Sequence, residues 1–194
     1  MDNSSNKRHL AFTLRFNGRT NALVISVKIS LPYNPEIDQN KEPPIPIECR
    51  AIWDTGATNS VITKALVQKA GLIPSGKEKV TNTSIVELRN KFFINLLLPN
   101  KVILPYLKVT ECEDVLGNGN IDMLIGMDVI GVGDFATTHE NGKTVMSFIV
   151  PPISTIDYVP ISESENRKQE TIENFESQKK TAFISPIAQK GPES

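Results

Sequence analysis

One stretch of the first half of the chain constrains the fold more than any other. An apolar run, Ala51-Ile52-Trp53, leads into a tight turn, Asp54-Thr55-Gly56-Ala57, and apolar residues resume at Val61-Ile62. Branched and aromatic side chains favour a strand on each side because they fit a pleated, half-buried surface. A glycine permits a sharp backbone path that a Cβ would resist. The pattern predicts a loop between two strands, with an aspartate at its mouth.

The same loop resembles the active-site loop of aspartic proteases, in which Asp-Thr-Gly-Ala follows apolar residues. A second match lies downstream, where two apolar residues and a glycine, Leu124-Ile125-Gly126, lead into a short predicted helix. Gly126 follows Asp54 by 72 positions, and Asp-Thr-Gly occurs once in the chain. Pepsin-like enzymes carry two such loops in one long chain, whereas retropepsins carry one and dimerise. The sequence therefore resembles the single-domain, retropepsin-like (retroviral-type) aspartic protease family, and its pattern looks closer to the bacterial members.

This resemblance implies a fold, an activity and a set of site residues. The fold would be an all-β, retropepsin-like acid protease barrel with one or two short helices and one lobe per chain. The activity would be that of an aspartic endopeptidase, with water activated between the two Asp54 carboxylates of a homodimer. The family's motif assigns catalysis to Asp54, Thr55 and Gly56, substrate contact to Gly56, Ala57 and Thr58, and support of the loop to Leu124, Ile125 and Gly126. Peptides or proteins would be the substrates, and no metal or organic cofactor is implied.

A second interpretation is that the chain is a catalytically inactive peptide-binding or adaptor module of the same fold. Asp, Thr and Gly are ordinary turn residues, and a fold can persist without its function. The chain also departs from many viral enzymes, which have acidic residues where this chain has Thr58-Asn59 and an Arg where it has Met127. Substrate preference therefore does not transfer from the family.

Composition narrows the other possibilities. The chain has 194 residues, 39% of them apolar, and a formal net charge of −1. One domain with an appendage fits this length, and the balanced charge argues against nucleic-acid binding and a polybasic membrane patch. The N-terminus has no signal-peptide pattern and no run is long enough to span a membrane, so a cytoplasmic location is expected. Two cysteines, Cys49 and Cys112, are too few for a disulfide framework or a zinc site and are expected to be reduced.

The expected domain runs from residue 10 to 150, between a flexible lead (1–9) and a polar, disordered tail (151–194). Alternating apolar residues and turn signals predict strands throughout this domain. The predicted strands are Leu10–Phe16 and Ala22–Leu31, joined as a hairpin through Asn17-Gly18, then Ile45–Trp53, Asn59–Ile62, Phe92–Leu98, Val102–Val109, Phe135–His139 and Thr144–Val150. A short helix is expected over Lys64–Ala70, capped by Thr63 and ended by Gly71.

Four segments allow more than one interpretation. The proline-rich stretch 32–44 is either a plain connector or a loop beside the cleft. Residues 77–90 lie where retropepsins place the flap that closes over substrate, but they lack the glycines of viral flap tips and equally fit a surface hairpin. The acidic run 111–114 is interpreted as a solvated strand end rather than a metal site. Residues 182–186 fit either a flexible tail or a segment that docks elsewhere or is trimmed by the protease itself.

Overall fold

The computed structural model describes residues 8–82, 85–115 and 119–183. The chain divides into two compact units, Met1–Ile153 and Ser154–Ser194, which are described separately. Most of the predicted flexible lead, the tip of the predicted flap and the last eleven residues lie outside the described ranges.

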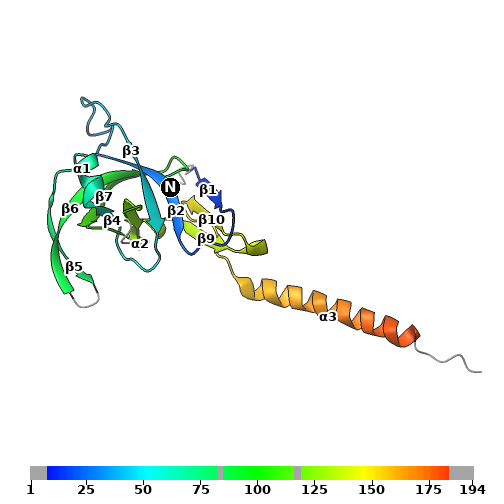
Figure 1. Ribbon diagram of the computed structural model, residues 1–194. Coiled ribbons are helices and arrows are strands. Elements are labelled where there is room, and N and C mark those ends of the chain that lie inside the picture. Colours follow the sequence, from blue (N-terminus) through cyan, green and yellow to red (C-terminus); the bar gives the residue numbers. More distant parts are fainter. Residues whose placement is uncertain (1–7, 83–84, 116–118, 184–194) are drawn as a thin grey trace, which may run out of the picture. The chain divides into compact units, whose positions relative to one another are not determined.

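The first unit is built on a sheet that closes into a barrel (Figure 1). The strands of this sheet are β2 (Leu23–Ser30), β3 (Ile47–Trp53), β4 (Val61–Thr63), β5 (Gly76–Asn82), β6 (Ile85–Leu97), β7 (Ile103–Cys112) and β8 (Met123–Ile125). Their order is β2-β3-β8-β4-β7-β6-β5, and an additional β2–β6 pairing closes six strands into a ring. β5 extends from that ring as the outer strand of the long β5–β6 hairpin. The predicted all-β barrel is confirmed.

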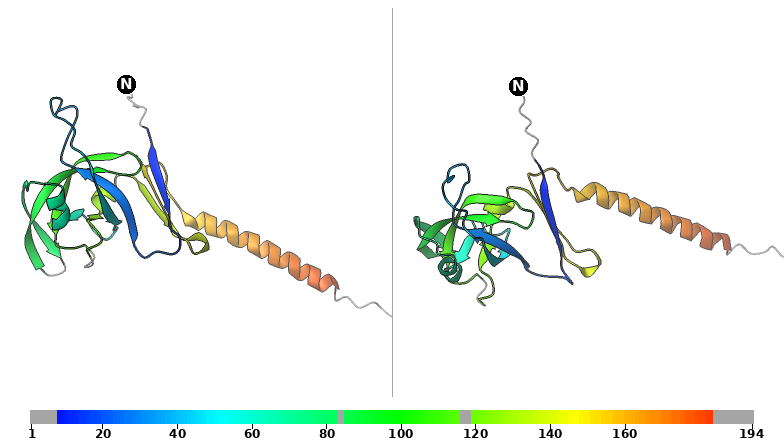
Figure 2. Two further views of the ribbon diagram at one scale, coloured as in Figure 1. Left: turned by 45° about the horizontal axis from the view of Figure 1, so that its top comes forward. Right: turned by 90° about the horizontal axis from the view of Figure 1, so that it is seen from above.

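A second sheet of three strands packs against the barrel (Figure 2). It contains β1 (Leu10–Arg15), β10 (Val145–Val150) and β9 (Asp134–Thr138), and a one-turn helix, η1 (Glu140–Gly142), joins β9 to β10. The β9–β10 hairpin matches the sequence prediction. The predicted opening hairpin is wrong, because β1 pairs with β10 rather than with β2. The segment between β1 and β2, which contains Asn17-Gly18, instead crosses from one sheet to the other. A hydrogen bond of 3.1 Å from the Thr144 amide to the Gly18 carbonyl holds it in place.

An aromatic cluster explains why β1 joins the second sheet. Trp53, at the end of β3, is only 5% exposed. Its ring lies 4.9 Å from Phe148, 5.5 Å from Phe135 and 6.0 Å from Phe12, measured between centroids. Pairing β1 with β10 sets Phe12 opposite Phe148, so both reach this ring. Alternation along β1 predicts a strand but does not specify its partner, and burial of large aromatic surface favours this one.

Two short helices border the barrel, in agreement with the predicted number. α1 spans Lys64–Lys69. The Thr63 hydroxyl caps its first turn by accepting from the Leu66 amide at 3.2 Å, and Gly71 adopts a left-handed conformation just after the helix. Those are the start and stop signals of a helix. α2 spans Met127–Ile130 and begins directly after Gly126.

The second unit contains a helix that the sequence analysis did not predict, α3 (Tyr158–Phe183). The Asp157 carboxylate accepts from the Val159 amide at 2.9 Å, as a helix-start residue does. Pro160 lies in the first turn, where a missing amide costs nothing. The segment is rich in Glu, Lys, Gln and Arg, which are good helix formers even when they bury little surface. Low hydrophobicity therefore did not imply an irregular chain. Among the described residues, no helix is both long and apolar enough to cross a membrane.

Candidate active site

The loop that carries Asp54 is anchored on β8. β3 runs parallel to β8 on one side, with Trp53 opposite Ile125, and β4 runs antiparallel on the other, with Val61 opposite Leu124. The chain therefore leaves β3 and returns in β4 on the two sides of one short strand. The Asp54 amide donates to the Ile125 carbonyl at 3.0 Å and so continues the ladder into the loop. This arrangement fixes both ends of the Asp54 loop.

The Asp54 carboxylate is oriented by its own turn. Its Oδ1 accepts from the Gly56 amide at 2.8 Å, and its backbone carbonyl accepts from the Ala57 amide at 3.3 Å. The side chain of Asp54 is half-buried, whereas Thr55 and Gly56 are exposed. Within the described part of the chain, no other group donates a hydrogen bond to this carboxylate.

Gly126 lies against the same loop. A Cβ on this residue would stand 2.8 Å from the Asn59 carbonyl carbon and 2.9 Å from the Ala57 carbonyl oxygen, distances that real Cβ atoms do not show. After it, the Met127 amide donates to the Ala57 carbonyl at 2.8 Å and the Asp128 amide donates to the Thr58 carbonyl at 3.1 Å. Ala57 and Thr58 are therefore held by backbone bonds from α2, and the glycine makes that close approach possible.

A hydrogen-bonded pair, missed from the sequence, connects the loop to α2 and consists of buried Ser60 and half-buried Asp128. The Ser60 hydroxyl donates to Asp128 Oδ1 at 2.8 Å and accepts from the Gly126 amide at 3.1 Å. The Ser60 amide donates to Asp128 Oδ2 at 3.0 Å. Ser60 lies in the predicted strand Asn59–Ile62 and Asp128 in the short helix predicted after Gly126, 68 positions further on, but the sequence assigned a role to neither.

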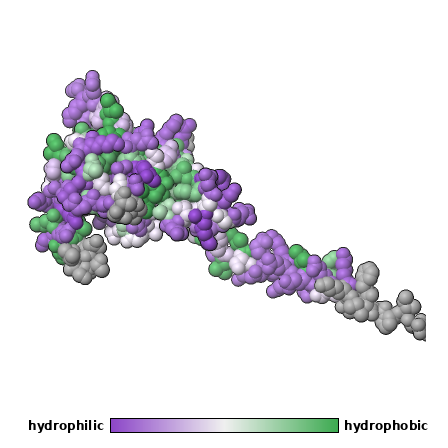
Figure 3. All heavy atoms as spheres, viewed as in Figure 1, coloured by the Kyte–Doolittle hydropathy of each residue, from purple (hydrophilic) through white to green (hydrophobic). Residues whose placement is uncertain are grey.

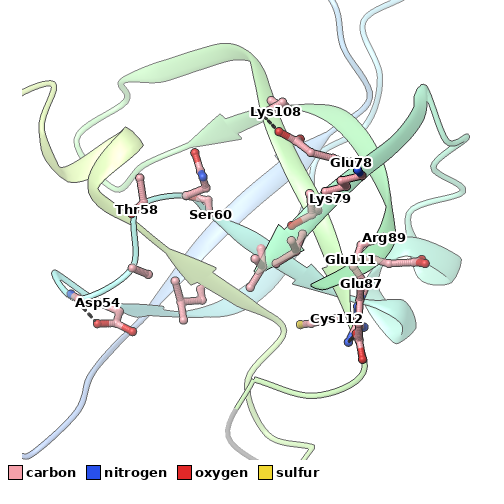
Figure 4. Close-up of a pocket in the computed structure, with 17 residues that line it drawn as sticks. Asp54, Thr58, Ser60, Glu78, Lys79, Glu87, Arg89, Lys108, Glu111 and Cys112 are labelled. Atoms are coloured by element: carbon pink, nitrogen blue, oxygen red, sulfur yellow. Dashed lines mark hydrogen bonds and ion pairs between the residues drawn. The ribbon is translucent and has the colours of Figure 1, made fainter. Parts of the chain in front are cut away.

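A pocket of about 860 Å³ opens between the Asp54 loop and the β5–β6 hairpin (Figure 4). Figure 4 shows Asp54 and Thr58 on the loop and Glu78, Lys79, Glu87 and Arg89 on the hairpin. The wall residues carry charges of both signs and come from β5, β6 and β7; they are Glu78, Lys79, Glu87, Arg89, Lys108 and Glu111. Four of these six residues lie in segment 77–90, for which the sequence left a flap and a surface hairpin open, but none of the six was named as a site residue.

Most of the wall charges are paired. Glu78 Oε1 accepts from Lys108 Nζ at 2.7 Å, and Glu87 pairs with Arg89 at 2.5 Å. Glu111 accepts from the Asn90 side chain at 2.8 Å. The second carboxylate oxygen of Glu78 is buried and has no hydrogen-bond partner among the described residues. A buried acceptor of this kind is normally satisfied by water or by a bound group.

The proline-rich segment 32–44 connects β2 to β3 and lies apart from this site. Together with neighbouring residues it lines a second pocket of about 490 Å³, and none of the residues around that pocket lines the first. Within the segment, Asp38 accepts from the Asn34 amide and from Lys41 Nζ. The backbone amide of Asn34 and then the Lys41 ammonium hold the pKa of Asp38 below its ordinary value.

Burial disfavours the thiolate form of both cysteines. Burial raises the pKa of Cys49 to about 12, and burial likewise raises the pKa of Cys112, which lines the first pocket. Both thiols are therefore protonated near neutral pH, and the reactive form of cysteine is the thiolate. In the acidic run, Glu113 pairs with Lys64. Within the described ranges, no three His, Cys, Asp or Glu residues are grouped as a metal site would require.

No family model and no curated relative matches the chain. Among solved structures, the chain is similar to a retropepsin-like aspartic protease from Rickettsia conorii, with 14% sequence identity and a TM-score of 0.42. The match covers 73% of this chain and 95% of the Rickettsia chain. The chain is also similar to the retroviral protease-like domain of Ddi1 from Leishmania major, with 14% sequence identity and a TM-score of 0.34. This match covers 62% of this chain and 91% of the Leishmania chain. A foamy viral protease-reverse transcriptase in complex with an RNA/DNA hybrid has 16% identity and a TM-score of 0.34, with 56% of this chain and 12% of that chain covered.

Proposed function

We propose that the chain is an aspartic endopeptidase of the retropepsin-like kind, which acts as a homodimer on extended peptide segments. One observation carries this proposal. The half-buried Asp54 carboxylate, oriented by the Gly56 amide, lines a pocket of about 860 Å³ that the β5–β6 hairpin also lines. An oriented carboxylate beside a cleft is what general acid–base catalysis of hydrolysis requires.

The need for a second carboxylate leads to the dimer. Hydrolysis requires one carboxylate to take a proton from water while another donates a proton to the carbonyl oxygen of the peptide. Within the described residues, the other carboxylates of the pocket are Glu78, Glu87 and Glu111, and each already accepts a hydrogen bond from a neighbouring side chain. A second copy related by a two-fold axis would supply its own Asp54 in the same loop. The two carboxylates would then share one proton, because like charges this close cannot both be ionised.

The reaction balances with these groups alone. The ionised carboxylate removes a proton from water as the oxygen attacks the peptide carbonyl carbon, and the protonated carboxylate transfers its proton to the carbonyl oxygen. The resulting diol collapses when the carboxyl group that took the proton from water donates it to the amide nitrogen, the other carboxylate removes a proton from a diol hydroxyl, and the C–N bond breaks. Exposed Thr55 would hydrogen-bond to the loop of the second copy, and exposed Gly56 would approach the substrate backbone, with Ala57 and Thr58 beside it.

The hairpin wall suits an extended peptide. β5 is the last strand of its sheet, so its outer edge can add a further strand by backbone hydrogen bonds. Because these contacts use the peptide backbone, they bind many sequences. The hairpin would act as the flap that excludes water from the reacting bond.

The same edge strand also favours the alternative function, a catalytically inactive module that binds a peptide by strand addition. The two functions differ in turnover and in their dependence on Asp54. Binding by the module would survive Asp54→Asn, and no peptide bond would break with either chain.

The test is cleavage of a diverse peptide mixture from about pH 4 to pH 7, where carboxylates and coupled carboxylate pairs titrate. Wild type is compared with Asp54→Asn, whose side-chain oxygen can still accept from the Gly56 amide. Asp157→Asn is the matched control, because Asp157 also accepts from the amide two residues further on. We expect cleavage by the wild type and the control but not by Asp54→Asn. Equal cleavage by all three, or binding without cleavage by any, would reject the peptidase.

A further inference from the structure

α3 carries a stripe of six residues at alternating spacings of three and four, the spacing that keeps residues on one face of a paired helix. The α3 stripe consists of Tyr158, Ile161, Glu165, Lys168, Ile172 and Phe175. Its four apolar members are 54% to 59% exposed. Figure 3 shows apolar residues interspersed along a helix that is otherwise hydrophilic. Apolar residues at this spacing normally face another helix.

The composition of α3 also divides around this stripe. Positions that flank it are mostly uncharged; they are Ser162, Ser164, Gln169, Thr171, Glu176 and Gln178. Charged residues gather on the remaining face, where Glu163 and Arg167 form an ion pair at 3.9 Å. A charged outer face, opposite a stripe whose two ends are apolar, fits a helix that pairs along one face.

We infer that the α3 stripe pairs with the α3 stripe of a second copy of this chain in antiparallel orientation. In the matching register, Tyr158 faces Phe175 of the second copy and Ile161 faces Ile172. Glu165 then faces Lys168 of the second copy, and the two-fold axis repeats each pair. Every layer is either apolar against apolar or acid against base. This match of apolar with apolar and acid with base follows from the order of the six residues along the stripe.

Other pairings of the same stripe are worse. A parallel pair in register sets Glu165 against Glu165 and Lys168 against Lys168, which brings like charges together. Sliding the antiparallel pair by one heptad sets Glu165 against Phe175 and Lys168 against Ile172, which buries charge on apolar surface. In the single chain, Lys168 Nζ lies 2.6 Å from Glu165 Oε1. The antiparallel pair would therefore join two ion pairs into one four-charge cluster.

The helix pair that the α3 stripe would form is short, so it would assist the assembly of a dimer rather than hold one together alone. The stripe covers 18 residues from Tyr158 to Phe175, or about 27 Å of helix. Six layers of this size form a weak contact alone but raise the effective concentration of any other contact between the two copies. If the proposed function holds, α3 pairing would favour assembly of the two Asp54 loops. The helix pairing itself does not depend on that function.

Charge reversal in the full chain tests the register. Glu165→Lys and Lys168→Glu each create like-charge layers in a homodimer, so we expect the dimer dissociation constant to rise roughly tenfold for each. Mixing the two variants restores opposite charges only between chains, because neither variant regains its internal ion pair. An isotope label on one variant allows native mass spectrometry to count the mixed dimer. We expect it to exceed clearly the half that random pairing gives.

Glu163→Lys and Arg167→Glu form the matched control, because they reverse an ion pair on the outer face. Their mixture should give the random proportion, and circular dichroism should show the same helix content in all four variants. A random proportion for the stripe variants, or a wild type that is monomeric throughout, would overturn the pairing. Cleavage by the wild type with random mixing would reject α3 pairing alone. Preferred mixed dimers without any cleavage would reject the proposed function alone.

Discussion

Ser60→Ala should destabilise the protein far more than removal of one hydroxyl usually does. Ser60 is fully buried, and its hydroxyl both donates to Asp128 and accepts from the Gly126 amide. Alanine would leave that buried amide without a partner, which costs about 1–3 kcal/mol, and would remove a bond to a carboxylate worth about 1.5–3 kcal/mol. Asp128 retains the Ser60 and Val129 amides, so the expected total is about 3 kcal/mol.

Urea unfolding followed by circular dichroism measures this loss as a lower midpoint with an unchanged slope. In a thermal scan, about 3 kcal/mol corresponds to a decrease in Tm of roughly 6–12 °C for a domain of this size. Ser26→Ala is the matched control, because the Ser26 hydroxyl also donates to a carboxylate, Glu48, but at an exposed site. It should change the free energy of unfolding by no more than about 0.5 kcal/mol. Equal effects of the two variants would refute the role assigned to Ser60.

Three further predictions concern other parts of the first unit. Gly126→Ala should lower the free energy of unfolding by about 1–3 kcal/mol, because the new Cβ would meet the backbone of the Asp54 loop. Gly18→Ala should be tolerated, because no atom lies within 4 Å of the new Cβ. The urea midpoints of the two variants compare these effects. Cys49 should resist alkylation at pH 8 in the folded protein and react on unfolding, because burial raises its pKa to about 12; mass spectrometry follows the label. The pKa of Asp38 is lowered in the folded chain, so the stability that its ionised carboxylate adds to the loop is present above pH 3.8 and is lost as pH falls through the lowered pKa. Asp38→Asn should remove this dependence on acid, which amide exchange in the loop measures.

Features that depend on neighbouring residues were predictable from the sequence. Thr63 and Gly71 mark the ends of α1 because capping and left-handed glycine act within one turn of the chain. The Asp54 loop was predictable for the same reason, since apolar residues on both sides of a glycine turn specify two strands and a bend. Gly126, which follows the second apolar pair, packs directly against that loop.

Features that depend on distant residues were not predictable. Alternation along β1 fits either β2 or β10, and the choice depends on Phe12 reaching Trp53, which no local pattern contains. The Ser60–Asp128 pair joins residues 68 positions apart. α3 was missed for another reason, because low hydrophobicity indicates little buried surface and does not exclude a helix built from good helix formers.

The central claim is that two copies of the chain each contribute one Asp54 to a single site. Subunit mixing tests it most directly. A fixed amount of wild type is allowed to exchange with increasing Asp54→Asn chain, and peptide cleavage is measured at each ratio. If a site needs both carboxylates, activity should fall to about half at an equal ratio and to about a tenth at a ninefold excess, as random pairing of two copies requires. Activity that stays constant at every ratio would show that one chain acts alone and would contradict the account.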